Sequence, residues 1–292
     1  MTLKCVNPAC TSSHLIKDGA YYRISDRKHV QRWKCKKCKT RFSAATRQKA
    51  YLQNKRQVNH SVFNLLASGV SMRRISLILN IHRITVARKL AFLAEIAREK
   101  QDAYLCSRLK IRDVQFDDLI TIEHTKYKPL TVSLAVENKT RQMLDFEVSV
   151  IPASGHLAEI SRSRYGWRPD ERKRGIMNLF GRIGHYLDKK PVFSTDEDTL
   201  YPGLIKRAFP DAVHKQYAGA KSRERGLGEL KKLKYDPLFS INHTLAMLRA
   251  NINRLFRRTW CTTKKRERLA QHIMVYMLFH NSLLTNCPVQ VG

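Results

Sequence analysis

Four of the seven cysteines form two short pairs near the N-terminus, Cys5 with Cys10 and Cys35 with Cys38. Two such pairs offer four thiolates, which is the donor set of a tetrahedral Zn²⁺ site. Disulfide bonds are the alternative, and they are disfavoured because the start, MTLKCVNPAC, lacks the apolar region of a secretion signal. We therefore predict a structural zinc site, and we expect buried, apolar roles for the remaining cysteines, Cys106, Cys261 and Cys287.

Two aspartates, Asp117 and Asp196, lie in apolar, strand-like stretches of the C-terminal half. Paired carboxylates hold Mg²⁺ or Mn²⁺ ions, which activate a water or a 3′-hydroxyl group for attack on a phosphate. Aspartates at strand ends also cap turns, so the two residues alone leave both interpretations open. The choice depends on whether the surrounding elements bring the two side chains together.

The order of the elements around these aspartates favours a pair. Three β-rich runs joined by short turns, DVQFDDLITIEH, KPLTVSLAVEN and RQMLDFEVSVIP, predict an antiparallel meander. A basic segment follows, then a fourth strand (PVFSTDED), helical patterns with a short strand, and the helices INHTLAMLRANINRLFRRTW and LAQHIMVYMLFHNSLL. This is the order of an RNase H-like domain, where Asp117 on the first strand and Asp196 at the end of the fourth lie side by side. We assign residues 113–286 to it.

The cysteine pairs belong to a small N-terminal module, residues 1–45. Between the pairs, GAYYRIS and HVQRWKCK alternate as the strands of a zinc ribbon do. A module this short cannot bury enough apolar area by itself. Metal binding would therefore supply much of its folding free energy. The polar and basic residues 46–58 predict a linker.

Residues 59–98 carry three apolar-periodic helices joined by short turns, with Ser61 and Ser71 as expected N-caps. This pattern predicts a helix-turn-helix whose last helix enters the major groove of DNA. The alternative is a three-helix packing domain without DNA contact. We expect the last helix to point four polar side chains outward for DNA binding: Arg83, Thr85, Arg88 and Lys89. A connector at 99–112 follows.

The charge of the chain indicates its partner. The 292 residues include 55 Lys and Arg against 24 Asp and Glu, a formal net charge of +31. Residues 1–112 hold 25 of the basic side chains and five of the acidic ones. This excess disfavours an ordinary metabolic enzyme and favours a polyanion. Because no stretch is apolar enough to span a membrane, we expect a cytoplasmic protein, associated with the bacterial nucleoid, that binds double-stranded DNA.

All three modules in this order resemble the transposases of the insertion-sequence-one family. In the front half the resemblance rests on QRWKCKKCKTRF and GVSMRRISLILNIHRITVARKL. In the back half it rests on FDD at 116–118, TDEDTLY at 195–201 and LRANINRLFRRTWC at 248–261. The resemblance covers nearly the whole chain. It implies a multidomain α+β protein in which a zinc ribbon and a helix-turn-helix precede a DDE-type catalytic domain, with Asp117 and Asp196 as the first two acids.

The third acid of that family is missing from its usual place. The resemblance puts it seven residues before Arg249, where this chain has Asn242. A neutral amide oxygen is a weaker Mg²⁺ ligand than a carboxylate. Three interpretations remain open: Asn242 is an adequate catalytic ligand, Glu224 or Glu229 replaces it, or the chain has lost cleavage and kept DNA binding.

Basic and aromatic side chains in the back half are further candidates for DNA contact. Four arginines form an expected phosphate-binding ridge beside the carboxylates: Arg249, Arg254, Arg257 and Arg258. Three aromatic residues could stack on unpaired bases, although packing within the protein is the interpretation we favour for them: Tyr165, Trp167 and Trp260.

We expect a DNA transposase that binds terminal inverted repeats and uses Mg²⁺ or Mn²⁺ to cleave 3′ ends and join them to target DNA. Two ends must be processed together, which implies a homodimer or a larger homo-oligomer. The alternative is a transposase-derived, sequence-specific DNA-binding regulator with a degenerate catalytic site. A nuclease of phage or repair type is a third, weaker interpretation.

Overall fold

A computed structural model describes residues 3–24, 27–108, 110–218, 236–256, 259–287 and 289. The chain forms two compact units, one of residues 1–63 with 290–292 and one of residues 64–289. Both units combine helices with one β-sheet, so the mixed α/β class is confirmed. The three module boundaries expected from the sequence stay predictions.

The first unit is built around a three-stranded antiparallel sheet of β1 (Leu15–Arg23), β2 (Lys28–Cys35) and β3 (Arg41–Ser43). Strands β1 and β2 overlap the two runs expected to form strands, and β3 was not predicted. Apolar contacts here are few: a small cluster of Cys5, Cys35 and Phe42 is its buried centre. So small a core supports the expectation that a metal contributes to the stability of this unit.

Three helices follow in the region of the predicted helix-turn-helix: α1 (Asn59–Ala67), α2 (Met72–Ile78) and α3 (Arg83–Cys106). The Ser71 hydroxyl accepts a hydrogen bond from the amide of Arg74 at 3.3 Å, so the expected cap of α2 is confirmed. Ser61 is not a cap, because α1 already begins at Asn59. The third helix continues into the predicted connector, because polar side chains along its last turns bond to the sheet described next.

The second unit contains a five-stranded mixed sheet with the order β6-β5-β4-β7-β8. Strands β4 (Ile111–Glu123), β5 (Thr125–Glu137) and β6 (Met143–Val150) form the antiparallel meander expected from their alternating residues. Strands β7 (Leu187–Thr195) and β8 (Val213–Gln216) are added on the other side of β4 and run parallel to it.

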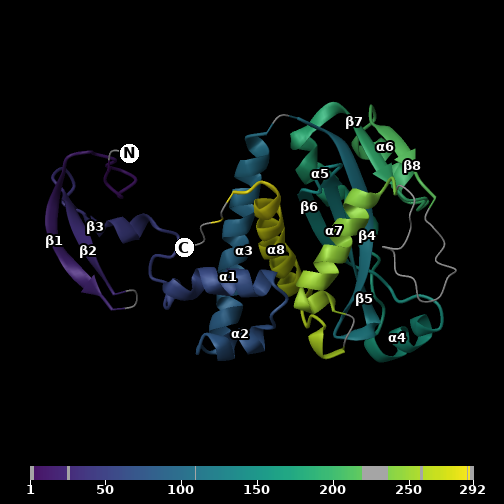
Figure 1. Cartoon of the computed structure of the whole chain (residues 1–292), viewed down its shortest axis with the longest axis horizontal. Coiled ribbons are helices and arrows are strands. Elements are labelled where there is room, and N and C mark those ends of the chain that lie inside the picture. The colour runs from purple at the N-terminus through teal and green to yellow at the C-terminus, as the bar shows by residue number, and fades with distance from the viewer. Residues whose placement is uncertain are drawn as a thin grey trace. The chain divides into compact units, whose positions relative to one another are not determined.

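Five helices complete the second unit: α4 (Leu157–Tyr165), α5 (Arg172–Ile183), α6 (Tyr201–Ala208), α7 (Phe239–Asn251) and α8 (Arg266–Leu284). The sequence predicts one helix up to residue 260, but α7 ends at Asn251 and short 3₁₀ turns follow. In Figure 1, α3 and α8 stand beside the β6 edge of the sheet, and α7 crosses β4 and β5. Among the described residues, no helix has the length and apolar character needed to cross a membrane.

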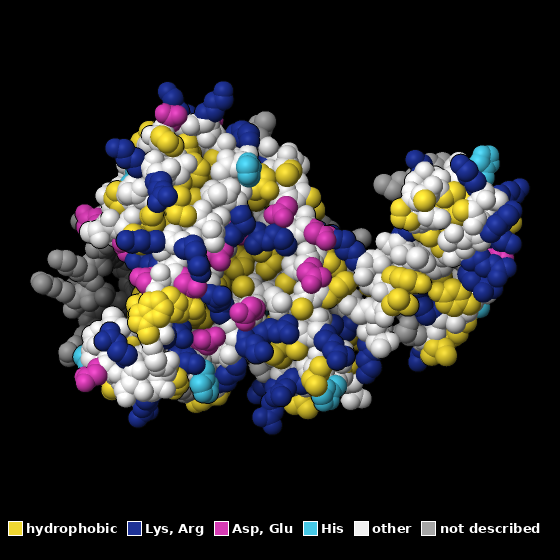
Figure 2. Space-filling view, turned by 180° about the vertical axis from the view of Figure 1, so that it is seen from behind, with side chains coloured by type: hydrophobic (Ala, Val, Ile, Leu, Met, Phe, Trp, Pro, Cys, Tyr) yellow, Lys and Arg dark blue, Asp and Glu magenta, His cyan; other side chains and the backbone are white. Residues whose placement is uncertain are grey.

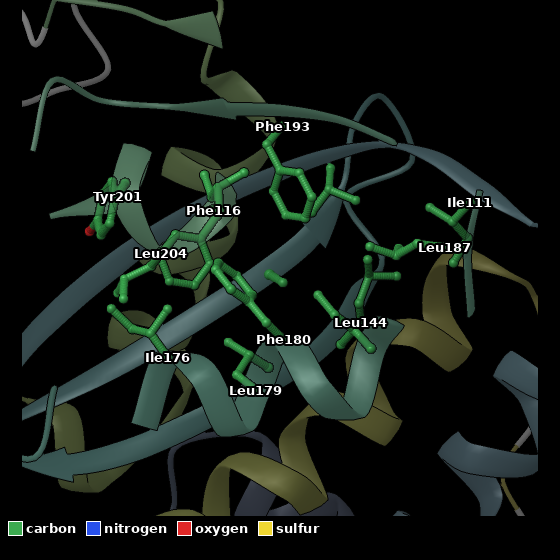
Figure 3. Close-up of a cluster of buried hydrophobic side chains, with 14 of the residues drawn as sticks. Ile111, Phe116, Leu144, Ile176, Leu179, Phe180, Leu187, Phe193, Tyr201 and Leu204 are labelled. Atoms are coloured by element: carbon green, nitrogen blue, oxygen red, sulfur yellow. The ribbon is translucent and has the colours of Figure 1, made fainter. Parts of the chain in front are cut away.

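Helices α5 and α7 cover opposite faces of the sheet. Phe116 on β4 packs against Phe180 of α5 and Tyr201 of α6, with ring centroids 5.1 and 5.0 Å apart in edge-on contacts (Figure 3). Its neighbour Gln115 points the other way and bonds to the start of α7: its amide donates to the Pro237 carbonyl oxygen at 2.7 Å. Successive strand residues alternate between faces, so Asp117 lies on the α7 face and Asp118 on the α5 face.

The last turns of α3 are joined to the sheet and to α8 by a buried polar network. The Gln101 amide donates to the carbonyl oxygens of Met143 and Leu144 at 3.0 and 3.2 Å, and Asn281 of α8 donates to Gln101 at 3.0 Å. Arg98 adds an ion pair with Asp145 at 2.8 Å. These bonds make the long third helix part of the second unit.

Gly175 lets α5 approach β6 closely, because a Cβ atom there would lie 1.9 Å from the Ser149 hydroxyl. We predict that Gly175→Ala lowers the free energy of unfolding by about 1–3 kcal/mol through overpacking. Gly181→Ala in the same helix is the matched control, because its Cβ would meet nothing within 4 Å. It should stabilise the helix by about 0.5–1 kcal/mol. Urea unfolding measures both, and equal effects of the two variants would contradict the packing argument.

Candidate functional site

The two cysteine pairs meet at one point of the first unit. All four Sγ atoms lie within 4.8 Å of one another, with Cys5 and Cys38 at 3.5 Å and Cys10 and Cys35 at 3.7 Å. These distances are far longer than the roughly 2.05 Å of a disulfide bond. They match the edge of a tetrahedron built on Zn–S bonds of about 2.3 Å, which is about 3.8 Å. The residues present therefore fit Zn²⁺, and this cluster could bind it.

The thiolate form that zinc requires is favoured at part of the cluster. Hydrogen bonding to Thr40 lowers the pKa of Cys38 to about 6. The expectation for the other cysteines is wrong: Cys106 and Cys287 are exposed and Cys261 is half-buried. Cys106 is the last residue of α3 and Cys287 follows the end of α8.

We predict that the purified protein binds one zinc ion per chain and that Cys35→Ser loses most of it, because Cys35 is the most buried of the four ligands. The exposed Cys106 provides the control, and Cys106→Ser should retain the metal. Elemental analysis gives the zinc content, and amide NMR signals of residues 3–43 report the folding of the first unit. Full zinc content in Cys35→Ser would contradict the assignment.

The structure brings Asp117 and Asp196 level on adjacent strands. Gln115 is the register partner of Ser194 in the parallel pair of β4 and β7, and each aspartate lies two residues further along its chain. The two carboxylates interact electrostatically. Burial, with the nearby Asp196 charge as a further cause, raises the pKa of Asp117 to about 7. Such a close pair of carboxyl groups is a candidate site for a divalent cation.

Arg172, at the first position of α5, fixes the surroundings of this pair. Its guanidinium donates to Asp118 at 2.5 Å, to Asp198 at 2.7 Å and to the Tyr201 hydroxyl at 3.2 Å. The same hydroxyl donates to the Asp117 carboxylate at 3.4 Å. Sequence analysis missed Arg172 and Tyr201, because the run RPDERKR around Arg172 resembles an ordinary solvated basic segment.

The third position of the site combines an amide with a carboxylate. The Asn242 amide donates to Asp236 at 2.9 Å, and the Asp236 carboxylate also caps the turn before α7 through the Leu238 amide at 2.8 Å. Among the described residues, three or more metal-binding side chains converge at the cysteine cluster and at no other place. At the aspartate site, Asp117 and Asp196 are therefore a pair without a third converging ligand among those residues. Glu224 and Glu229 lie outside the described residues.

Asp236 is a candidate third carboxylate that sequence analysis missed. Gln115 holds this end of α7 through two hydrogen bonds, to the Pro237 carbonyl and from the Ile241 amide at 2.9 Å. Gln115 and Asp117 lie two residues apart on the same face of β4, so Asp236 precedes a segment anchored beside the pair. An acid just before a helix resembles a capping residue, which is why its position gave no signal in the sequence.

Three of the four residues predicted to face outward on α3 do so at least in part. Arg83 and Arg88 are exposed and Thr85 is half-buried. The prediction is wrong for Lys89, which is 2% exposed. Burial lowers the pKa of its ammonium group to about 8. Lys89 lies on the face of α3 that also buries Val86, Leu90 and Leu93, whereas periodicity alone assigned it to the exposed side.

The predicted arginine ridge is not a row of exposed side chains. Arg254 is largely buried and donates to Thr263 at 3.3 Å; burial and the charge of Arg268 lower its pKa to about 10. Arg249 is half-buried near the end of α7. The side chains of Arg257 and Arg258 lie outside the described residues.

The favoured packing role is wrong for both candidate tryptophans. Trp167 is 77% exposed and Trp260 is 76% exposed. Tyr165 is partly covered, with its ring 6.4 Å from that of Tyr127. Exposed indole rings are unusual on a monomeric surface and mark candidate contact sites.

A groove of about 870 Å³ lies between α3, α5, α8 and β6, away from the aspartate pair. Acidic and basic side chains alternate along it, and Figure 2 shows both kinds on this face of the second unit. Several are already joined in ion pairs, such as Glu171 with Arg266 and Glu147 with Arg182. The groove is therefore internally neutralised and is not the candidate for a polyanion.

Comparison with known proteins adds little to this geometry. No family model matches the sequence, and no curated protein matches it. Among solved structures, a chain of a simian T-cell lymphotropic virus intasome, in complex with the PP2A regulatory subunit B56 gamma, is similar with 15% identity and a TM-score of 0.25. The likeness covers 72% of this chain and 71% of that one. At that TM-score it supports no conclusion about this protein.

The raised pKa of Asp117 predicts a pH-dependent stability in the absence of divalent metal. The folded state binds this proton more tightly than the unfolded state, so stability falls as pH rises from about 4 to about 7, where the folded-state pKa lies. Asp117→Asn should therefore stabilise the metal-free protein at pH 8, by at most about 4 kcal/mol, and have little effect at pH 4.

Urea unfolding at both pH values measures this effect. Asp211→Asn is the control, because Asp211 is exposed and lies outside the site. A stabilisation of Asp117→Asn that is equal at both pH values would rule out the titration as its cause.

Proposed function

We propose that this protein is a DNA transposase whose second unit contains an RNase H-like catalytic domain of DDE type, similar to the insertion-sequence-one family. The observation that carries the proposal is the strand order β6-β5-β4-β7-β8, with Asp117 on the central strand and Asp196 directly after its parallel neighbour. The elements follow one another along the chain as predicted for such a domain, and acids on these two adjacent strands would share a metal site.

Each residue of the site would have a distinct role. Asp117, Asp196 and the third ligand would hold Mg²⁺ or Mn²⁺, which supplies an activated oxygen nucleophile and stabilises the leaving oxygen. Tyr201 orients the Asp117 carboxylate by a hydrogen bond. Arg172 neutralises Asp118 and Asp198, so that the negative charge left at the site belongs to the metal-binding pair.

We propose Asp236 as the third carboxylate and Asn242 as the residue that orients it. The Asn242 amide donates to one Asp236 oxygen and the Leu238 amide donates to the other. An amide at position 242 can make this bond, whereas the glutamate of the family would repel Asp236. This chain therefore has an amide at position 242, where the family has a glutamate, and a separate acid, Asp236, bonded to that amide.

DNA ends would be recognised by the zinc-binding unit and by the exposed start of α3. Arg83 and Arg88 are the side chains that this proposal assigns to DNA contact. Processing of two ends requires at least a homodimer. Lys89 and Arg254 are left out of the DNA-binding set, because burial removes them from a phosphate backbone.

A DNA-binding regulator without cleavage activity is the second candidate function. It is favoured by the absence of a converged trio of metal-binding carboxylates among the described residues. The two functions share DNA binding and differ in metal-dependent strand cleavage, so one assay separates them.

We predict that cleavage and strand transfer on DNA carrying the ends require Mg²⁺ or Mn²⁺ and fall by roughly 10²–10⁴-fold in Asp117→Asn, Asp196→Asn and Asp236→Asn. Gel analysis of labelled ends measures the products. The exposed residue Asp211 gives the control variant Asp211→Asn, which should remain active.

Binding without any cleavage by the parent protein would support the regulator. Full activity of Asp236→Asn would remove that residue from the proposed metal site and leave the assignment of the other two intact.

A further inference from the structure

A second candidate site surrounds the exposed Trp167, between β6 and α5. A hollow of about 280 Å³ lies here, lined by both apolar and charged side chains. Its volume is below that of a typical pocket for a drug-sized ligand and is sufficient for one planar ring system. Its apolar walls include Pro152, Ala153 and Ala158, and its polar walls include Arg162, Arg168 and Asp170.

Local structure holds this hollow open. Gly166 ends α4 with a φ of 74°, a backbone conformation that side chains disfavour, and so turns the chain outward at Trp167. The Ser161 hydroxyl of α4 donates to the Tyr127 carbonyl oxygen at 2.7 Å and joins the helix to β5. The indole is therefore presented by an anchored segment and not by a loose loop.

Cation–aromatic pairs lie on β5 and on the end of α4, next to the residues that line the hollow. The Lys128 ammonium lies 4.7 Å from the centre of the Tyr165 ring, and Lys126 and Arg164 lie 5.5 and 5.6 Å from that of Tyr127. Interleaved aromatic and basic side chains are the usual surface for single-stranded nucleic acid, whose bases stack while its phosphates are neutralised. On the face shown in Figure 2, exposed hydrophobic patches on the second unit are bordered by Lys and Arg side chains.

Arg168 lines the hollow and is anchored on the sheet. Its guanidinium donates to the Pro129 carbonyl oxygen at 3.3 Å and lies 3.8 Å from Glu123. Its Nε atom is buried and has no hydrogen-bond partner among the described residues. The contacts of the guanidinium with β5 and β4 hold Arg168 in place at the edge of the hollow.

The hollow lies at a suitable distance from the aspartate pair. Pro129 is the register partner of Ile122, five residues beyond Asp117 on β4. At about 3.4 Å per residue this is about 17 Å, a span of no more than about five stacked nucleotides. Asp170 also accepts the amide of Arg172 at 3.0 Å, so the segment that lines the hollow leads directly to the network around Asp118.

We propose that the Trp167 hollow binds one unpaired base of a single-stranded DNA end, by stacking on the indole, while the surrounding arginines and lysines hold the adjacent phosphates. The inference rests on the proposed function, because an end that is cut and joined is partly unpaired near the aspartates. Asp170 favours a base edge over a phosphate inside the hollow, because its carboxylate accepts N–H donors of a base, such as N3–H of thymine, and repels anions.

The test measures DNA binding without added divalent metal, so it does not depend on catalysis. Fluorescence anisotropy gives the affinities for a labelled single-stranded oligothymidine of about 12 nucleotides and for a blunt duplex. Trp167→Ala should weaken single-strand binding by about 5- to 150-fold and change duplex binding less than about twofold. Trp167→Phe should restore most of the affinity. Arg83→Gln should show the opposite pattern, because it lies on the predicted duplex-binding helix.

Trp260→Ala is the matched control, because it removes an indole of equal exposure that does not line the hollow. Quenching of Trp167 fluorescence by oligothymidine, in a protein that carries Trp33→Phe and Trp260→Phe, reports stacking even if Trp167→Ala fails to fold. Unchanged single-strand affinity in a folded Trp167→Ala, or no quenching, overturns the proposal. A change of oligomeric state without a change of affinity would assign the hollow to protein association instead.

Absence of cleavage with intact, Trp167-dependent binding would contradict the proposed function and leave this site standing. Active cleavage with single-strand binding that does not depend on Trp167 would contradict this site and leave the proposed function standing.

Discussion

The structure depends on how negative charge is held in the interior of a strongly basic protein. Burial of Asp117 raises its pKa, and the charge of the nearby Asp196 raises it further. Two further carboxylates, Asp118 and Asp198, lie close by and would add to the repulsion. Arg172 pairs with both, and so leaves the uncompensated charge on the two residues that a cation would neutralise.

This requirement extends to the packing of α5. Arg172 reaches the sheet from the first turn of the helix, and Gly175, one turn later, is the point at which α5 lies almost against Ser149. A larger side chain there would move the helix outward and with it the guanidinium. Tyr201 links the same arginine to Asp117 through its hydroxyl while its ring packs on Phe116. The apolar core and the polar site therefore share residues and depend on one geometry.

Periodicity and spacing were sufficient for much of this arrangement. The alternating runs predicted β4 to β6 in order, and the cysteine spacing predicted which four thiols meet. The same reasoning was wrong for Lys89, because the buried face of α3 is wider than the apolar residues alone indicate and includes this lysine. It did not find Arg172, because the partners of this residue lie more than 25 residues away in the sequence. It did not find Asp236, because an acid at a helix start resembles an ordinary capping residue. Local patterns do not encode such long-range pairings.

The amide at position 242 is best understood together with its partner. A site of this kind needs carboxylate oxygens from three segments, and it does not matter to a cation which residue of the third segment supplies them. In this chain the acid lies before the helix and the amide lies on it, joined by a hydrogen bond that a glutamate could not donate. Gln115 holds the start of α7 from the strand that carries Asp117, which supports the proposal that Asp236 acts as the third carboxylate. Under that proposal, an amide at position 242 is compatible with a metal site.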